Sequence, residues 1–352
     1  MSRLISMLEQ QISESDTTSG EVGGQRERNH RYWSLQPLGN EQRGRSHYID
    51  PRVFAAVESK KGVFSETFLS NRQVVRFNGA NQDESDAKSA YVQKVLKSND
   101  YHALFRDGWH DAFVAKRMTV WVDWRRNHEP ETFTFSGAPE AAVNAALSKL
   151  DIVELVESTL ETKQMPTING GQQVFVTGEI TVLVNRGYLE LDLIQPEYVM
   201  RDPSQSYCGD AMWNSARMDI SRVMLVEWGF DPGQVAQLDS DYRWGSNSED
   251  YARKQHDGSF STANSQRGDQ QEVTIYKTRT WLSPEDFDSV AGLEEFEPES
   301  GAAIYEIYWG LGKIMNWADG TPAIKPMYEM AVYEWSEFKV SHAENGMCTA
   351  DV

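Results

Sequence analysis

The sequence is poor in the features that mark secreted and membrane-spanning proteins. It has only two cysteines, Cys208 and Cys348, and no Asn-x-Ser/Thr acceptor site, which fits a reducing cytoplasm. No run of 18 apolar residues occurs, so we expect no transmembrane helix. The apolar residues 4–8 are too few, and too soon followed by Glu9, to form a secretory signal. At 352 residues the chain is long enough for two or three domains with a sizeable core.

Motifs for nucleotide binding and nucleophilic catalysis are also missing. There is no P-loop, no Gly-x-Gly-x-x-Gly and no Gly-x-Ser-x-Gly elbow. The two cysteines lie too far apart in sequence for a zinc knuckle. His102 and His110 are about two helical turns apart, but Arg106 lies between them, and we interpret the pair as the polar surface of an amphipathic helix. We therefore expect no catalytic residue, no metal and no cofactor.

Positive charge is scarce. The chain has 34 Lys and Arg residues against 53 Asp and Glu residues, a net charge of −19. A protein that holds nucleic acid by its phosphates needs clustered cations, so strong non-specific DNA binding is not expected. An acidic protein can still surround DNA without holding it, as a channel wall does. The most basic region is interpreted as surface charge or ion pairs, with phosphate contact as the alternative; it contains Arg26, Arg28, Arg31, Arg43 and Arg45.

Periodicity predicts an α+β fold with antiparallel β-hairpins. We expect residues 1–42 to be a mobile arm, because a short amphipathic piece is followed by Ser, Thr and Gly. Residues 43–238 mix helices and strands, 239–271 form a polar loop or disordered insertion, and 272–352 are β-rich. The chain then stops as if cut within a folded protein.

Residues 43–124 have the clearest local pattern. Asp50 before Pro51 predicts a capped helix start, and Gly62 a bend or break. Two apolar stripes at helical spacing predict a helical hairpin joined at Asn99 and Asp100. The further predicted elements are helices over 83–98, 101–115, 139–160 and 220–238, a strand over 118–125, a β-hairpin of 172–184 with 188–194 about Gly187, and strands over 273–282, 303–309 and 328–340.

Residues 283–306 contain eight acidic residues and no Lys or Arg. The run lacks the Asp-x-Asp-x-Asp-Gly spacing of a calcium loop, so a solvated, repulsive surface is the simplest interpretation. Its members are Glu285, Asp286, Asp288, Glu294, Glu295, Glu297, Glu299 and Glu306.

A series of short motifs carries a resemblance over most of the chain. In order they are Gly44-Arg45-Ser46 with Asp50 and Val53, Val74-Val75-Arg76-Phe77, Trp109-His110-Asp111-Ala112-Phe113, Val120-Trp121-Val122, Pro196-Glu197-Tyr198, Asp202-Pro203, Asp210-Ala211, His342 with Gly346, and Ala350-Asp351. Together they resemble the portal (head–tail connector) proteins of tailed bacteriophages, especially the P22-like short-tailed type.

The resemblance implies a structural protein and no enzyme. It implies a ring, usually of twelve copies, at one capsid vertex, through which double-stranded DNA passes during packaging and ejection without tight binding. The implied partners are other copies of the chain, the terminase large subunit, a head–tail adaptor, and the major capsid or scaffold protein, with no membrane. Assembly would take place in the bacterial cytoplasm, and the product would be part of the virion. Residues 43–238 would correspond to a wing-like domain and 272–352 to a stem- or clip-like region.

Within that resemblance, the acidic residues from Glu285 to Glu299 are candidates for a channel-facing or adaptor-facing surface. Reversing their charges should then leave folding intact but impair packaging or adaptor docking, and no change in either would remove the hypothesis.

The sequence departs from the family in three places. Gly62 stands where relatives often carry proline, 239–271 has no clear counterpart, and relatives continue past the position of Val352 into a long helical region. We therefore expect an N-terminal portion of a portal protein. Two alternatives stay open: a nucleic-acid-processing enzyme with an acidic metal site, which would show Mg²⁺-dependent activity, and a capsid or scaffold component that forms no ring.

Overall fold

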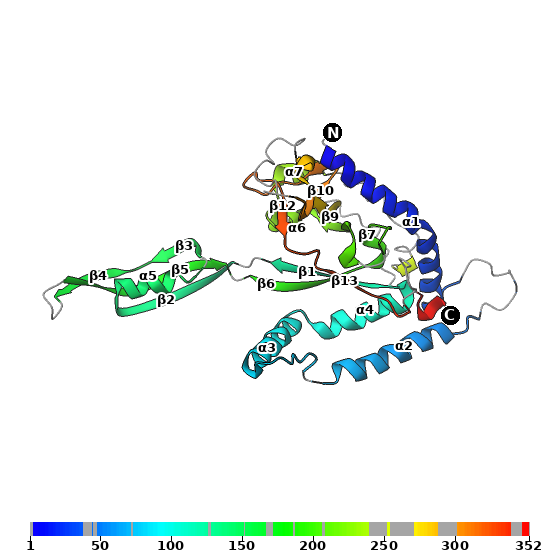
Figure 1. Cartoon of the computed structure of the whole chain (residues 1–352), viewed down its shortest axis with the longest axis horizontal. Coiled ribbons are helices and arrows are strands. Elements are labelled where there is room, and N and C mark those ends of the chain that lie inside the picture. Colours follow the sequence, from blue (N-terminus) through cyan, green and yellow to red (C-terminus); the bar gives the residue numbers. More distant parts are fainter. Residues whose placement is uncertain are drawn as a thin grey trace. The chain divides into compact units, whose positions relative to one another are not determined.

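The computed structural model describes residues 3–37, 44, 48–71, 73–125, 128–150, 152–166, 172–185, 187–205, 208–238, 252–253, 271–287, 301–338 and 347–351. The chain divides into two compact units: unit 1 is Met1–Trp121 with Asp192–Val352, and unit 2 is Val122–Leu191. Both contain helix and antiparallel sheet, so the predicted α+β class is confirmed (Figure 1). None of the described helices is long and apolar enough to cross a membrane.

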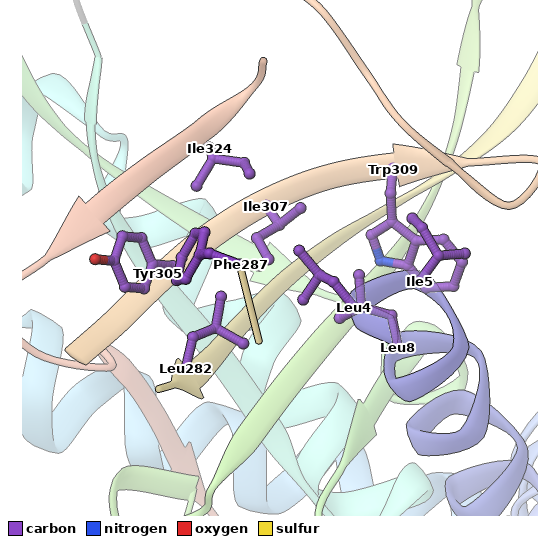
Figure 2. Packing of buried hydrophobic residues seen from close by; sticks show 9 residues of the cluster. All are labelled: Leu4, Ile5, Leu8, Leu282, Phe287, Tyr305, Ile307, Trp309 and Ile324. Carbon is purple, nitrogen blue, oxygen red and sulfur yellow. The ribbon is translucent and has the colours of Figure 1, made fainter. Parts of the chain in front are cut away.

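The N-terminal segment is a long helix, α1 (Arg3–Trp33), and the predicted mobile arm is wrong there (Figure 1). Leu4 and Leu8 are fully buried against residues of the large sheet, among them Ile307 and Trp309 (Figure 2). At the other end of α1, the Asn29 side chain donates to the Val114 carbonyl oxygen at 3.1 Å. Tertiary contacts at both ends therefore hold the Ser/Thr/Gly-rich middle in a helix that its own propensity disfavours.

The helical part of unit 1 has its own aromatic core. The Phe64 ring packs edge-on against Trp109 and Phe113, with centroids 5.6 and 5.3 Å apart. Val57 is fully buried in the same cluster. The elements are α2 (Arg52–Phe64), the π-helix η1 (Ser65–Leu69), α3 (Gln82–Ser98) and α4 (Tyr101–Ala115), so the two predicted helices after residue 82 are confirmed.

The start of α2 lies where it was predicted, but its cap differs. Pro51 occupies the N-cap position, and no side chain caps the helix. The Asp50 carboxylate instead lies 2.9 Å from Nε of Arg52. Helix continues through Gly62, and the change of winding comes at η1, where bonds to the fifth residue replace those to the fourth.

A large antiparallel sheet forms the rest of unit 1, with strand order β11-β10-β9-β8-β7 and β12 paired to β10. Both faces are buried: α1 covers one through Leu4 and Leu8, and Leu225 and Phe230 pack on the other. The bounds are β7 (Val199–Arg201), β8 (Trp213–Ser221), α6 (Arg222–Glu227), α7 (Pro232–Gln237), β9 (Glu272–Leu282), α9 (Pro284–Phe287), β10 (Ala303–Gly310), β11 (Lys313–Ile314) and β12 (Ile324–Met327), with the short helices η2 (Pro196–Tyr198), η3 (Cys208–Asp210) and η7 (Thr349–Asp351).

The sheet joins two regions that were expected to be separate domains. Strand β8 comes from the predicted 43–238 region and pairs with β9 of the predicted 272–352 region, from Trp213 opposite Thr280 to Ser221 opposite Glu272. The predicted boundary is therefore wrong, because the chain before and after the 239–271 stretch contributes neighbouring strands to one sheet.

A second, three-stranded sheet has the order β13-β1-β6. Strand β1 (Met118–Arg125) matches the predicted strand, and it pairs with β13 (Val332–Trp335), with Trp121 opposite Val332. Within the described part of the predicted strand over 328–340, only these four residues form a strand, and they pair with β1 outside the large sheet.

Unit 2 is built around one strand, β5 (Gln172–Asn185). It pairs with β2 (His128–Pro139) on one side, and with β3 (Ile152–Ser158) and β4 (Glu161–Pro166) on the other. The helix predicted over 139–160 is confirmed only for α5 (Glu140–Leu147). Beyond it, the β-branched run of 152–158 forms a sheet strand, because pairing with β5 outweighs helical periodicity.

The predicted hairpin about Gly187 is wrong in its pairing. Strand β6 (Tyr188–Ile194) belongs to the β13-β1-β6 sheet, whereas β5 pairs with β2, β3 and β4. Strand β2 was missed because Pro130 and Gly137 interrupt its alternation. A Cβ at position 187 would lie 2.2 Å from the Trp124 indole, so glycine allows that ring to pack against the backbone.

Candidate functional site

The candidate acidic surface is only partly described, and its described members differ. Glu285 is exposed, with 77% of its side chain accessible. Asp286 is mostly buried: it accepts hydrogen bonds from the Ser283 backbone nitrogen and hydroxyl, both at 2.8 Å, and lies 3.7 Å from Nε of Arg3. Asp286 therefore has a structural role, because its carboxylate binds the residue that precedes α9. Asp288, Glu294, Glu295, Glu297 and Glu299 lie outside the described residues.

Glu306, the last member of the acidic run, lies in the interior. It is 4% exposed and accepts from Nε of Arg279 at 2.8 Å, with Nζ of Lys277 at 3.6 Å. The Arg279 guanidinium also stacks 4.6 Å from the Trp121 ring. This part of the run is a buried ion pair and no solvated surface, since register places Glu306 directly opposite Arg279 on the paired strand.

A second buried ion pair lies on the strand next to β8. Arg201 in β7 is 1% exposed, and its Nη1 lies 2.9 Å from Oε2 of Glu334 in β13. The Cys208 thiol donates to the same oxygen at 3.1 Å. Burial raises the pKa of Cys208 to about 11, so this thiol stays protonated and unreactive at neutral pH.

The basic N-terminal region does not form one exposed patch. Arg26 is 3% exposed and donates to the Pro196 carbonyl oxygen at 3.2 Å. Arg31 pairs with Glu27 at 2.6 Å, while Arg28 is at the surface. Internal contacts therefore account for Arg26 and Arg31; Arg43 and Arg45 lie outside the described residues.

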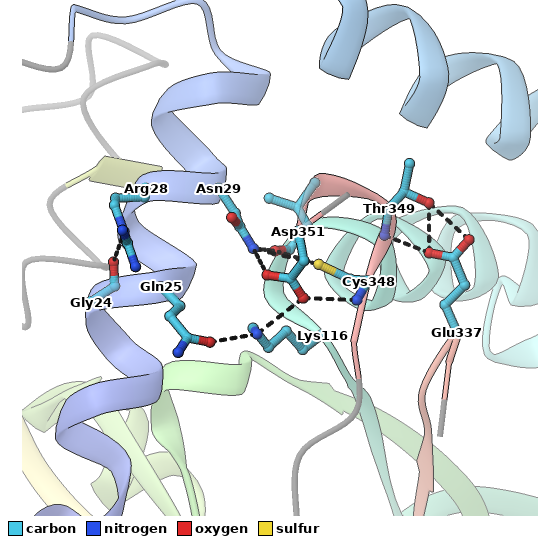
Figure 3. Close-up of polar contacts among 10 residues, drawn as sticks. Gly24, Gln25, Arg28, Asn29, Lys116, Glu337, Cys348, Thr349 and Asp351 are labelled. Atoms are coloured by element: carbon cyan, nitrogen blue, oxygen red, sulfur yellow. Dashed lines mark hydrogen bonds and ion pairs between the residues drawn. The ribbon is translucent and has the colours of Figure 1, made fainter. Parts of the chain in front are cut away.

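Asp351, from the last motif of the resemblance, ties three segments together (Figure 3). Its carboxylate accepts from Nδ2 of Asn29 at 3.0 Å, from Nζ of Lys116 at 3.0 Å, and from the Cys348 backbone nitrogen at 2.9 Å. Burial alone would raise the pKa of Asp351, but these donors outweigh it and hold the pKa below the usual 3.8. The motif thus has a structural role at the junction of α1, the end of α4 and η7.

Two other motifs of the resemblance meet around Arg253. Asp111 of α4 accepts from Nη1 of Arg253 at 2.7 Å, and Glu197 of η2 accepts from Nη2 at 3.0 Å. Both motifs were identified in the sequence, but no role was predicted for either carboxylate. The contact was missed because the arginine lies 142 and 56 positions further along the chain, in the polar 239–271 stretch, where no local signal marks it.

The two histidines of α4 do not act together. The His110 ring packs edge-on against Trp33 at 4.4 Å, whereas His102 lies against Tyr101 at the surface. Within the described ranges, no group of three or more His, Cys, Asp or Glu side chains is placed to hold a metal ion.

His30 is buried on α1, 6.3 Å from the His110 ring. Burial, followed by the charges of Arg253, His110 and Arg26, holds the pKa of His30 well below 6.5. As the pH falls below 6.5, His30 is therefore protonated in the unfolded chain but stays neutral in the folded chain. The stability of the folded chain is full above pH 6.5 and decreases as the pH falls below it.

We expect this histidine to contribute about 1.4 kcal/mol of lost stability per pH unit below 6.5, until the folded pKa is reached. Denaturant unfolding at several pH values should show a shallower pH slope in His30→Gln than in the wild type. His102→Gln, at an exposed position on α4, is the matched control and should keep the wild-type slope. Parallel curves for all three proteins would contradict the assignment.

Three partly exposed aromatic side chains from distant segments lie beside residues of α2 in unit 1. Phe68 and Trp335 both contact Phe64, with ring centroids 5.6 and 6.0 Å apart, and Nζ of Lys60 lies 5.2 Å from the Phe338 ring. Phe68 is 53% exposed, Trp335 38% and Phe338 46%. We call these three residues the aromatic surface. Exposed apolar side chains gathered in one place are typical of interfaces between proteins.

The comparison with family models gives a match to the phage SU10 portal protein over residues 4–283. No curated protein matches the chain. The match covers α1, the aromatic core, all of unit 2 and the strands up to β9, so it extends over both compact units. The chain therefore belongs to the phage SU10 portal protein family, and its role is that of a structural component of the phage particle.

Proposed function

We propose that the chain is a subunit of a ring at one capsid vertex, the channel for genome packaging and DNA ejection. The family match over residues 4–283 carries this proposal. In it, about twelve copies assemble in the bacterial cytoplasm, as in P22-like phages. The terminase large subunit, a head–tail adaptor and the capsid or scaffold protein dock on the ring.

The charge of the chain supports a passive channel. With a net charge of −19, each copy repels the phosphate backbone, which favours passage of double-stranded DNA without tight binding. Glu285 and the other acidic candidates between Asp288 and Glu299 would add to such a surface, whereas Asp286 is occupied by internal contacts.

The aromatic surface is our candidate for the contact between neighbouring copies. Its three side chains are large and partly exposed, and they come from two segments that both contact Phe64, through Phe68 and Trp335. Aromatic residues contribute strongly to subunit interfaces, because each one removes a large apolar area from water.

Mass photometry and negative-stain microscopy of the purified 40.0 kDa chain test the proposal. We expect rings at physiological salt, and Phe68→Glu or Phe338→Glu should shift the population to monomers that remain folded. Val223→Glu is the matched control, because Val223 is 49% exposed on α6.

Three outcomes would count against parts of this proposal. A monodisperse monomer for both this chain and a version extended past Val352 contradicts the ring, and Mg²⁺-dependent nuclease activity in those samples would favour an enzyme instead. Rings that persist in both glutamate variants would remove the aromatic surface as the contact. Retention of double-stranded DNA by the rings at physiological salt would contradict a passive channel.

A further inference from the structure

Arg253 is held in the interior of unit 1 although its surrounding sequence is polar. Its side chain is 20% exposed, and the neighbouring Ala252 is 1% exposed. These two residues are the described part of the stretch between Leu238 and Gln271. A long cationic side chain is rarely buried without specific partners, so its surroundings identify what it recognises.

The partners are two carboxylates that are themselves out of solvent. The Asp111 side chain is 5% exposed and the Glu197 side chain is fully buried. Arg253 donates one hydrogen bond to Asp111 at 2.7 Å and one to Glu197 at 3.0 Å. Its Nε also lies 2.8 Å from Oε1 of Glu197. Two guanidinium nitrogens therefore donate to the two carboxylates and the third lies at ion-pair distance from Glu197. A planar guanidinium presents two such donors in a fixed fork, and an ammonium does not.

The two carboxylates lie on elements that have other contacts besides those to Arg253. Asp111 lies in α4, next to the buried Ala112 and Phe113. Glu197 lies in η2, where the Pro196 carbonyl oxygen accepts from Arg26 and from Arg117, both at 3.2 Å. Both carboxylates thus lie on elements with packing or hydrogen-bond contacts besides those to Arg253, and the pair carries one more negative charge than the arginine neutralises.

We propose that Asp111 and Glu197 form a guanidinium-binding site, and that Arg253 fills it as a tethered ligand that fastens the chain at residue 253 to α4 and η2. The ligand class is the guanidinium group of an arginine side chain. The inference rests on contacts within unit 1 and is independent of ring formation.

Chemical rescue tests the site directly. In the full chain, Arg253→Ala should lower the melting temperature, and millimolar ethylguanidinium should restore part of the loss along a saturable curve. Ethylammonium at the same concentrations should have no such effect, because it lacks the planar set of donors. The wild type, whose site is filled, should not respond to either compound.

Two further variants separate a binding site from a general effect of the compounds. Arg3→Ala is the matched control: Arg3 also lies beside two carboxylates, Glu285 and Asp286, but at 3.9 and 3.7 Å with 62% of its side chain exposed. It should show no saturable rescue. Adding Asp111→Asn to Arg253→Ala should abolish the rescue, since one of the two charged acceptors is gone.

If Arg253→Ala does not fold, Arg253→Lys provides a second test. Lysine keeps the positive charge of the side chain but lacks the planar set of donors, and its effect on the melting temperature is measured. A lysine variant with wild-type melting temperature would overturn the proposal, and a lowered one supports it. Equal rescue by ethylammonium and ethylguanidinium, or no saturable rescue of folded Arg253→Ala, would also overturn it.

Discussion

Arg279→Met is expected to destabilise unit 1 by about 3–5 kcal/mol, because it leaves a buried charge without its main partner. Arg279 is fully buried, and both Nε and Nη2 lie 2.8 Å from Oε2 of Glu306. Its Nη1 donates to the carbonyl oxygens of Met330 and Ala331 at 2.8 and 3.0 Å. After the substitution, Glu306 would keep only the more distant Lys277 among the cations that now contact it.

Denaturant unfolding followed by tryptophan fluorescence measures this loss. Arg52→Met is the matched control: Arg52 also pairs with a carboxylate at 2.9 Å, but its side chain is 89% exposed, and we expect a change within about 0.5 kcal/mol. The double variant Arg279→Met with Glu306→Leu should recover part of the loss, since it removes the unpaired charge as well. A loss below about 1 kcal/mol in the single variant would show that Lys277 or water compensates Glu306.

Leu8→Ala is expected to cost about 2–5 kcal/mol, the usual range for a cavity at a fully buried leucine. Leu8 is 0% exposed and belongs to the cluster that includes Leu282, Ile307 and Trp309 (Figure 2). If residues 1–42 were a mobile arm, the same substitution would have almost no effect on unfolding. The experiment therefore distinguishes the helix from the arm.

Gln10→Ala is the control for Leu8→Ala, because Gln10 lies two residues further along α1, about half a turn round the helix, on its exposed side. Its side chain contacts Glu14 at 2.8 Å on the surface, and we expect a change within about 0.5 kcal/mol. Equal, small effects for both variants in denaturant unfolding would contradict the packing of α1 on the large sheet.

Elements with a strong local period were predictable from the sequence. Tyr101, Trp109 and Phe113 recur at helical spacing, and α4 buries all three. The alternating segments that became β1, β9 and β10 were located to within one or two residues. The order of motifs also pointed to the portal family, which the family match confirms.

Elements whose state depends on distant partners were not predictable. The helix α1 has Ser, Thr and Gly through its middle. It is stabilised by the burial of Leu8 in the cluster that contains Trp309, and by the hydrogen bond from Asn29 to Val114. Because β6 follows β5 directly in the chain, we predicted that the two would pair as a hairpin. In the structure β5 pairs with β2 instead, from His128 opposite Asn185 to Pro139 opposite Phe175. Alternation identifies a strand and says nothing about which strand it pairs with.

Composition, the missing catalytic motifs and the local periods were determined by the sequence alone, because each depends on residues that are close together in the chain. The tertiary structure alone decided the roles of the charged residues. Glu306 looked like part of a solvated acidic run, and it lies buried opposite Arg279. Asp111, Glu197 and Arg253 are scattered along the chain and meet in one place. The physical reason is that a charge takes its role from its desolvation and its partners, and folding from distant parts of the chain supplies both.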